Sequence, residues 1–327
     1  MSRRTALCAL SSAASTLALG GCTKLDGPAA QLEVADLAGN PTLLVATTRN
    51  PVDDASAERW FGSERAAKMS VARAKLTPPN EGRFSLSAMA LEDWRVEAVV
   101  PVPNVGRLLS DGAGVRDVLV YVHGYNQTFE TAAIDAARLS DGVKFRGDTM
   151  IFSWPSKARF FDYGYDRESA MWSRDALDQV LSALLASPNV RRTHIVAHSI
   201  GTMLAMETLR QLYARRGPAL VKKIGAVVCA APDIDMDVFA SSVKRIGPLA
   251  KRITVITATN DRALALASWI AGGVTRVGAS EKAELQRMGL QVVDASPEGW
   301  GVLNHDLFLS NAHIWRVIRA AIDARVA

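Results

Sequence analysis

Short apolar runs alternate with amphipathic helical segments along most of this chain, and that alternation restricts it to few architectures. Several runs are continuous in Val, Ile and Leu, as expected of strands buried on both faces of a sheet. The predicted strands are Leu43–Thr47, Arg95–Val99, Val118–Val122, Thr149–Ser153, His194–Ala197, Ala226–Ala230, Ile253–Ala258 and Leu290–Val293. The pattern predicts an α/β fold with a mostly parallel sheet of about eight strands and helices on both faces.

The helices between these strands can be placed from their periodicity. We expect helices at Ala170–Ala186, where Leu recurs at helical spacing, at 201–216, and at His313–Val326. Gly217-Pro218 stops the second of them. The charged stretch from 50 to 93 has no clear period, and we interpret it as an N-terminal extension over the sheet.

One short stretch carries the strongest chemical signal. The apolar strand at His194–Ala197 runs almost directly into Ser199, and a helix follows at once. A serine on such a strand–turn–helix junction stands above the sheet, and the residues two before and two after it must be tiny. Here they are Ala197 and Gly201. The pattern predicts that Ser199 is a nucleophile.

The same junction predicts two donors for an oxyanion. The amide of Ile200 begins the helix and has the helix dipole behind it. The second donor should come from the turn after the strand Val118–Val122, where Tyr125 follows a His-Gly pair. We interpret His123, inside that turn, as a structural residue rather than a base.

In a nucleophile-elbow enzyme the acid and the histidine follow the serine in chain order. After Ser199 the sequence has only His305 and His313. His305 lies in a polar loop before the last helix, where a base is expected, whereas His313 begins that helix and fits a capping or surface role. His198, beside the nucleophile, is interpreted as structural.

The acid is predicted at Asp261, which follows the strand Ile253–Ala258. Its carboxylate would accept the proton-bearing ring nitrogen of His305 and fix its tautomer. Asp233 or Asp235, one strand earlier, stays open as the alternative.

Seven short motifs together resemble a bacterial α/β-hydrolase family of unknown function, whose members are described as esterase/lipase-superfamily enzymes. They are Ala46-Thr-Thr-Arg49, Tyr121-Val-His-Gly-Tyr-Asn126, Phe152-Ser-Trp-Pro155, Ala197-His-Ser-Ile-Gly201, Ala231-Pro-Asp233, Asn260-Asp-Arg-Ala-Leu264 and Asn304-His305. The resemblance covers roughly residues 41 to 320. It implies an α/β-hydrolase fold and the triad Ser199, Asp261 and His305, but no substrate.

The first residues read as an export signal. Arg3 and Arg4 precede an uncharged stretch that ends in Gly-Gly-Cys22, which resembles the processing box of a bacterial lipoprotein. We expect a signal peptide at 1–22 with Cys22 as the acylation site, a tether at 23–40 and a single hydrolase domain at 41–327. The expected location is the cell envelope, through a lipid anchor in the membrane. Thr23 is not the Asp that retains lipoproteins at the inner membrane, which favours the periplasmic face of the outer membrane.

Composition and charge restrict the classes of molecule that the protein is expected to bind. The net charge of +5 is dispersed along the chain, so the sequence lacks the clustered footprint of a nucleic-acid-binding protein. Its His and Cys residues show no metal-ligand spacing, and no glycine-rich phosphate loop appears, so we expect neither a metal nor a cofactor.

The sequence therefore predicts hydrolysis of a small-molecule carboxylic ester through an acyl-enzyme on Ser199, and a lipid-like ester is one such substrate. The alternatives left open are an inactive binding lipoprotein on the same fold, or an acyltransferase or amidase with the same triad. Trp154 and the pair Phe160-Phe161 fit either an acyl pocket or the core.

Overall fold

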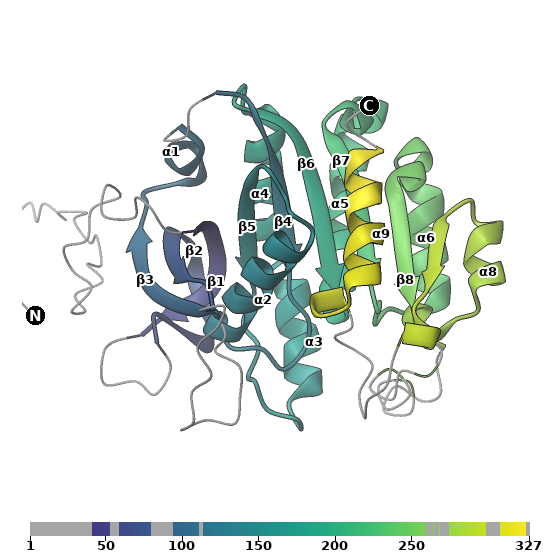
Figure 1. The fold of residues 1–327 in the computed structure, drawn as a ribbon, viewed down its shortest axis with the longest axis horizontal. Coiled ribbons are helices and arrows are strands. Elements are labelled where there is room, and N and C mark those ends of the chain that lie inside the picture. The colour runs from purple at the N-terminus through teal and green to yellow at the C-terminus, as the bar shows by residue number, and fades with distance from the viewer. Residues whose placement is uncertain are drawn as a thin grey trace, which may run out of the picture.

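The computed structural model describes residues 41–52, 59–79, 94–110, 114–258, 260, 264, 268, 275–298 and 308–324. These residues form one nine-stranded sheet with the order β3-β2-β1-β5-β4-β6-β7-β8-β9 (Figure 1). Its strands are β1 (Thr42–Pro51), β2 (Phe61–Thr77), β3 (Arg95–Pro101), β4 (Arg116–Val122), β5 (Asp148–Ser153), β6 (Val190–His198), β7 (Ile224–Ala230), β8 (Ile253–Thr257) and β9 (Gln291–Asp294). The predicted α/β class is confirmed, and each of the eight predicted strands is present.

Strand direction divides the sheet into two parts. The pairs β1–β2 and β2–β3 are antiparallel, whereas β1 pairs in parallel with β5, and β4 to β9 are all parallel to one another. The carboxyl ends of β4 to β8 therefore meet at one edge of the sheet. In an open α/β sheet this is the edge at which sites form.

The interpretation of residues 50 to 93 as an extension over the sheet is wrong, because β2 is a strand within the sheet. Only its second half alternates between buried and half-buried positions, with Ala72, Ala74 and Leu76 turned into the core. Its first half is rich in charged residues and Ala, which are depleted in strands, so its intrinsic strand propensity is weak. Pairing with β1 on one side and β3 on the other overrides that weak propensity.

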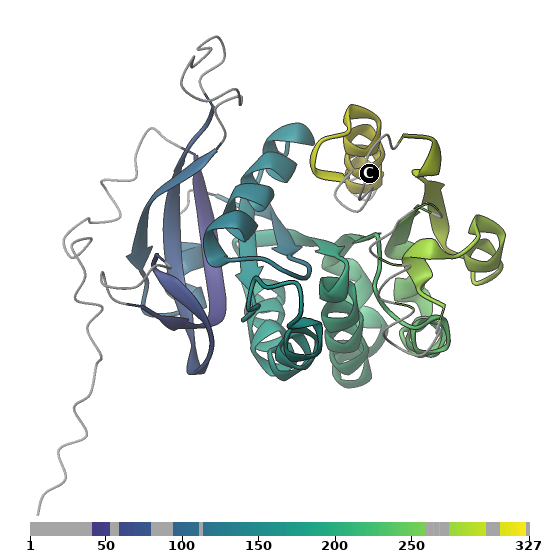
Figure 2. The same cartoon turned by 90° about the horizontal axis from the view of Figure 1, so that it is seen from below.

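Helices cover both faces of the sheet (Figure 2). One face carries α2 and α9, and the other carries α4, α5 and α6, each face with its own apolar core. The described helices are α1 (Val105–Ser110), α2 (Phe129–Gly142), α3 (Tyr163–Trp172), α4 (Arg174–Ala186), α5 (Ile200–Arg216), α6 (Met236–Arg245), α8 (Lys282–Arg287) and α9 (Ala312–Asp323). Among them, none is long and apolar enough to cross a membrane.

The segment Ala170–Ala186, predicted as one helix, belongs to two. The helical conformation is interrupted at Ser173, between the end of α3 and the start of α4. Ser173 is buried, and its hydroxyl donates to the carbonyl of Ser169 (2.8 Å) and contacts Oγ1 of Thr48 (2.8 Å). A buried polar residue with partners on β1 explains why the apolar period did not reveal the break. The helix predicted at 201–216 is confirmed as α5, and Gly217 ends it with a φ of 58°.

Candidate active site

Ser199 lies between the last residue of β6 and the first residue of α5. Its backbone has φ 52° and ψ −123°, a left-handed conformation that costs a non-glycine residue about 1–3 kcal/mol. The surroundings hold this conformation: the amide of Ser199 donates to the carbonyl of Ala230 (3.0 Å), and its carbonyl accepts from the amide of Asp233 (3.2 Å). The predicted strained turn is therefore present at this serine.

The small residues around Ser199 have a steric cause. A Cβ atom on Gly201 would lie 2.4 Å from the carbonyl oxygen of His123 and 2.7 Å from that of Val122. Ala197 is fully buried between Val122 on β4 and Cys229 on β7. The elbow thus packs directly against the end of β4, which leaves no room for larger side chains.

The turn after β4 lies against the nucleophile. A Cβ atom on Gly124 would lie 2.9 Å from the Cβ of Ser199. Tyr125 follows Gly124, and Ile200 is the buried first residue of α5. The structure thus brings together the segments that hold Ser199 and the two expected oxyanion donors.

His123 makes contacts of a structural kind. Its ring stacks on Trp154 with centroids 4.5 Å apart, and Nε2 accepts from the amide of Trp154 (3.1 Å). Nδ1 lies 2.8 Å from the carbonyl oxygen of Gly124, so the tautomer with a proton on Nδ1 satisfies both ring nitrogens. Burial, with a smaller contribution from the Arg49 charge, lowers the pKa of His123 to about 3. A neutral ring bonded to the backbone at both ends holds the turn rather than accepting a proton from Ser199.

Arg49 lies near the end of β1, and its side chain contacts the turn after β4. It is fully buried, and its guanidinium donates to Oγ of Ser153 (2.8 Å) and to the carbonyls of Ser156 (3.2 Å), Gly62 (3.1 Å) and Gln127 (2.6 Å). A buried cation is tolerated because these oxygens replace its water shell. Arg49 lies in one of the family-like motifs, but its sequence context suggested no role.

Asp166, a buried residue of α3, holds the other side of the turn. Its carboxylate accepts from the amides of Lys157 (2.8 Å) and Asn126 (3.2 Å) and from the hydroxyl of Ser156. Burial raises the pKa of Asp166, and the three donors oppose that rise. Asn126 itself has φ 60°, so the residue after Tyr125 is held in a left-handed conformation. Sequence reasoning missed Asp166, because a polar residue on the buried face of a helix breaks the apolar period.

The alternative acids have other partners. Asp233 is buried, with Oδ1 3.1 Å from Nε of Arg276, and its Oδ2 accepts from the Tyr163 hydroxyl (2.8 Å). Asp235 caps α6 and accepts from the amide of Val238 (2.9 Å). Both carboxylates therefore have structural tasks. The predicted acid Asp261 and base His305 lie outside the described residues, as do Cys22 and the predicted segments 1–22 and 23–40.

The remaining aromatic and histidine residues named in the sequence analysis differ in how deeply they are buried. Trp154 is fully buried, so it belongs to the core, whereas Phe160 and Phe161 are 61% and 94% exposed and do not. His198 is buried, and its ring packs against Phe308 with centroids 4.5 Å apart. His313 is exposed near the start of α9, where Asn311 caps the helix.

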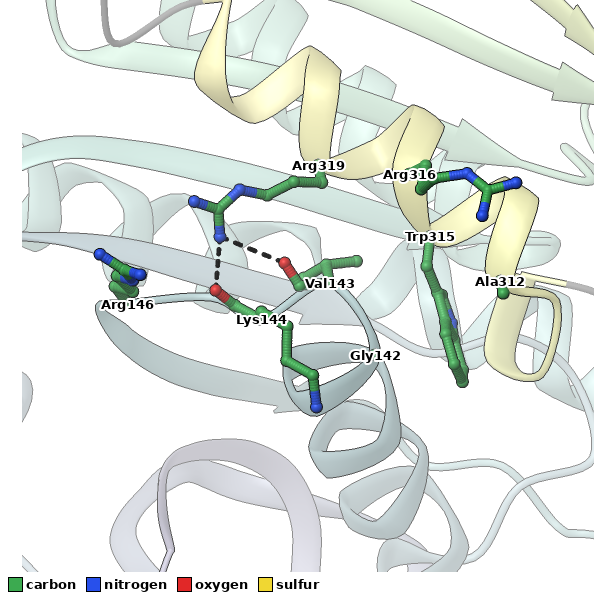
Figure 3. Close-up of a pocket in the computed structure, with 8 residues that line it drawn as sticks. All are labelled: Gly142, Val143, Lys144, Arg146, Ala312, Trp315, Arg316 and Arg319. Atoms are coloured by element: carbon green, nitrogen blue, oxygen red, sulfur yellow. Dashed lines mark hydrogen bonds between the residues drawn. The ribbon is translucent and has the colours of Figure 1, made fainter.

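An open pocket of about 370 Å³ lies between the end of α2 and α9, and Ser199, Ile200 and Tyr125 are not among its lining residues (Figure 3). Arg319 closes one side of it by donating to the carbonyls of Val143 (3.2 Å) and Lys144. Its lining residues are Gly142, Val143, Lys144, Arg146, Ala312, Trp315, Arg316 and Arg319. This lining has no Ser, Cys, His or carboxylate side chain, so it lacks the residue types of a hydrolase triad. Across the described residues no group of three His, Cys, Asp or Glu could hold a metal ion.

Comparison with known sequences assigns the chain to a protein family. Residues 106–321 match the family described as alpha/beta hydrolase of unknown function (DUF900). The chain belongs to this family. The matched region runs from α1 to α9 and includes the Ser199 elbow and the turn after β4. Membership confirms the resemblance and the α/β-hydrolase fold.

Individual relatives are distant. An uncharacterized protein of Nostoc sp., alr1448, is 27% identical over 123 residues, which are 30% of this chain and 32% of that protein. The chain thus spans about a third of the length of this relative. Among solved structures, an esterase of Pyrobaculum calidifontis is 12% identical with a TM-score of 0.39, covering 90% of both chains. The catalytic core of a Trichoderma reesei acetyl xylan esterase is 11% identical with a TM-score of 0.39, covering 64% of this chain and 98% of that one. With TM-scores this low, the fold assignment rests on the family match and the sheet topology.

Proposed function

We propose that this α/β hydrolase cleaves carboxylic esters through an acyl-enzyme on Ser199. The observation that carries the proposal is the left-handed backbone of Ser199 at the β6–α5 junction, with the Gly124 turn against it. Strain of this kind persists only where the surroundings over-determine it, and it clusters at active sites. Family membership supports a hydrolase, and the choice of ester is our inference from the site.

The reaction follows from the roles of the five candidate residues. His305 takes the Ser199 hydroxyl proton while Oγ attacks the ester carbonyl, and Asp261 stabilises the imidazolium. The amides of Ile200 and Tyr125 donate to the oxyanion of the tetrahedral intermediate. When this intermediate collapses, the C–O bond to the alcohol breaks and His305 gives its proton to the leaving oxygen. Loss of one such oxyanion donor typically costs about 3–4 kcal/mol of transition-state stabilisation.

Deacylation repeats these steps with water. His305 takes a proton from the water as its oxygen attacks the acyl carbon. The bond to Ser199 Oγ then breaks, Oγ recovers the proton, and the carboxylic acid leaves. An alcohol in place of water would make the same site an acyltransferase, and an amide in place of the ester would make it an amidase.

The nucleophile can be tested by mass spectrometry. The protein is treated with a fluorophosphonate, its intact mass is measured, and turnover of p-nitrophenyl acetate is followed in parallel. We expect one adduct and ester turnover, both absent in Ser199→Ala and retained in Ser110→Ala, an exposed serine at the end of α1. A folded protein with neither adduct nor turnover would overturn the proposal and favour an inactive binding protein. A matched p-nitroanilide and an added alcohol acceptor separate the amidase and the acyltransferase.

We also propose that the chain is exported and acylated at Cys22. The support is the sequence of the first 22 residues, where a basic start and an uncharged stretch end in Gly-Gly-Cys22. Labelling with an alkyne-bearing palmitate in cells should mark the wild-type protein and not Cys22→Ala. Equal labelling of both, or of neither, contradicts this assignment.

A further inference from the structure

Two adjacent phenylalanines stand out on the surface of the described residues. Phe160 is 61% exposed and Phe161 94% exposed, and their rings meet edge to face with centroids 5.4 Å apart. The other large exposed apolar residues, such as Val115 and Val238, occur singly. Leaving a Phe side chain in water forgoes the favourable free energy of burying its apolar surface. Two neighbouring exposed rings are a feature of surfaces that contact an apolar partner.

The pair is attached to the candidate active site. It lies in the connection between β5 and α3, and the hydroxyl of Tyr125 donates to the backbone carbonyls of Arg159 (3.0 Å) and Phe160. Burial raises the pKa of Tyr125 to about 12, so this hydroxyl keeps its proton at neutral pH. The residue that supplies an expected oxyanion donor thus also holds the loop that presents the phenylalanines.

A second tyrosine continues the aromatic series toward the nucleophile. The ring of Tyr163 meets that of Tyr125 edge to face, with centroids 5.6 Å apart. Its hydroxyl donates to Asp233, whose amide donates in turn to the carbonyl of Ser199. We call Phe160, Phe161, Tyr125 and Tyr163 the aromatic ridge. Its two ring contacts, Phe160–Phe161 and Tyr125–Tyr163, are joined by the hydrogen bond from the Tyr125 hydroxyl to the Phe160 carbonyl.

We propose that Phe160 and Phe161 insert into a lipid surface, and that the substrate of Ser199 is a long-chain ester presented from that surface. This inference rests on the proposed function. An acyl chain that leaves the lipid can stay against the aromatic ridge while its ester approaches Ser199. The substrate class is therefore a water-insoluble ester in a membrane or lipid aggregate.

The charges around the pair indicate which lipid surface it fits. Arg159 precedes the two rings and Asp162 follows them, one charge of each sign. Lys157, nearer β5, is paired with Glu64. This balance suits a zwitterionic surface, to which binding is driven by buried apolar area rather than by attraction to anionic headgroups.

The expected anchor is compatible with this orientation. The chain enters the sheet at Thr42, the start of β1 and the edge opposite the carboxyl ends of the parallel strands. Crossing the sheet along the 10 residues of β1 takes roughly 33 Å, whereas a tether of 18 residues reaches about 60 Å when extended. A lipid on Cys22 therefore leaves the ridge free to face the same membrane.

The test compares vesicle binding with chemistry on a soluble substrate. Every protein begins at Thr23, after the expected signal peptide, so that neither the apolar signal nor an acyl anchor contributes to vesicle binding. Binding to phosphatidylcholine vesicles is measured by co-sedimentation, together with turnover of p-nitrophenyl acetate in solution and of p-nitrophenyl palmitate in the vesicles. The variants are Phe160→Ser with Phe161→Ser, and Val238→Ser as the matched exposed apolar control.

We expect the double variant to lose about tenfold or more in vesicle binding and in palmitate turnover, since the inserted apolar area is gone. Its acetate turnover should stay within about twofold, and Val238→Ser should match its parent in all three. Unchanged vesicle binding overturns the docking surface, and equal loss on acetate and palmitate overturns the substrate class. If the parent binds vesicles but shows no fluorophosphonate adduct, the proposed function fails and the docking surface stands. Binding that appears only when anionic phosphatidylglycerol is added contradicts the zwitterionic surface.

Discussion

Gly124 and Ser199 are in direct contact: a Cβ atom on Gly124 would lie 2.9 Å from that of Ser199 and 2.7 Å from Nδ1 of His198. Real Cβ atoms do not approach other atoms so closely, so only glycine fits between the turn and the elbow. The contact sets how far the Tyr125 amide lies from the nucleophile. The turn, the elbow and the buried groups beneath them form one positioning unit.

Gly124→Ala should therefore impair the chemistry more than the fold. We expect fluorophosphonate labelling of Ser199 to slow by about tenfold to 100-fold, because the turn must shift by an ångström or so and misplace a donor. Far-UV circular dichroism should stay unchanged. Gly164→Ala is the control, since no atom lies within 4 Å of its Cβ position, and its labelling rate should equal that of the wild type. Equal labelling rates in both variants would contradict the role of this contact.

Asp166→Asn should lower kcat without a comparable change in KM. The amide keeps one acceptor oxygen but loses the charge that orders the amides of Asn126 and Lys157, so the turn loosens. We expect kcat to fall by about tenfold to 100-fold. Asp117→Asn is the matched control: Asp117 is a buried carboxylate held by Arg191 (2.7 and 2.9 Å), but it lies at the opposite edge of the sheet. Both variants should lose stability, and a similar kcat loss in both would indicate a purely structural role for Asp166.

The triad acid can be identified by two asparagine substitutions. Asp261→Asn should reduce kcat by about 10³-fold to 10⁴-fold, as loss of the oriented carboxylate does in serine hydrolases, with little change in the melting temperature. Asp233→Asn should instead lower the melting temperature, because it leaves the buried Arg276 without its anionic partner. The reverse pattern, measured by kinetics and thermal unfolding, would assign the acid to Asp233.

Stability should fall as the pH is lowered below the usual pKa of histidine. Burial lowers the folded-state pKa of His123 to about 3 and that of His194 to about 4, whereas both titrate near 6.5 in the unfolded chain. Between these values the unfolded state binds more protons, so stability is complete above about pH 6.5 and is lost as the pH falls. The slope approaches about 1.4 kcal/mol per pH unit for each group.

Urea unfolding between pH 7.5 and 5 measures this slope. His194→Gln should reduce the slope of unfolding free energy against pH by the contribution of one histidine, up to about 1.4 kcal/mol per pH unit. This holds whatever the substitution does to stability at pH 7.5. Identical slopes in wild type and His194→Gln would show that His194 titrates alike in both states.

The fold could be predicted where short-range signals dominate. Strands β4 and β7 could be predicted from their continuous runs of residues without charge, because strands buried on both faces need no alternation. Strand β2 was missed because its stability comes from two neighbouring strands rather than from its own residues. The break at Ser173 was missed because its polar partners are far away in the chain.

The sequence by itself determined the chemistry of the elbow. A strand, a serine and a helix in succession, with Ala197 and Gly201 as neighbours, require the strained turn that is observed, since larger side chains collide with the end of β4. The motif can be recognised within about ten residues of sequence, although the atoms that exclude larger side chains come from the end of β4.

Only the tertiary structure decided what supports that chemistry. Arg49 meets Ser153 and Gln127, and Asp166 meets Asn126, across 40 to 104 residues of chain. Such contacts depend on β1 lying beside β5, an order set by long crossovers and not by local pattern. Likewise the exposure of Phe160 and Phe161 follows from the path of one loop, because the same residues could equally have filled a core. Partners of buried polar and surface apolar groups are chosen by the whole packing, which is why the sequence alone left them open.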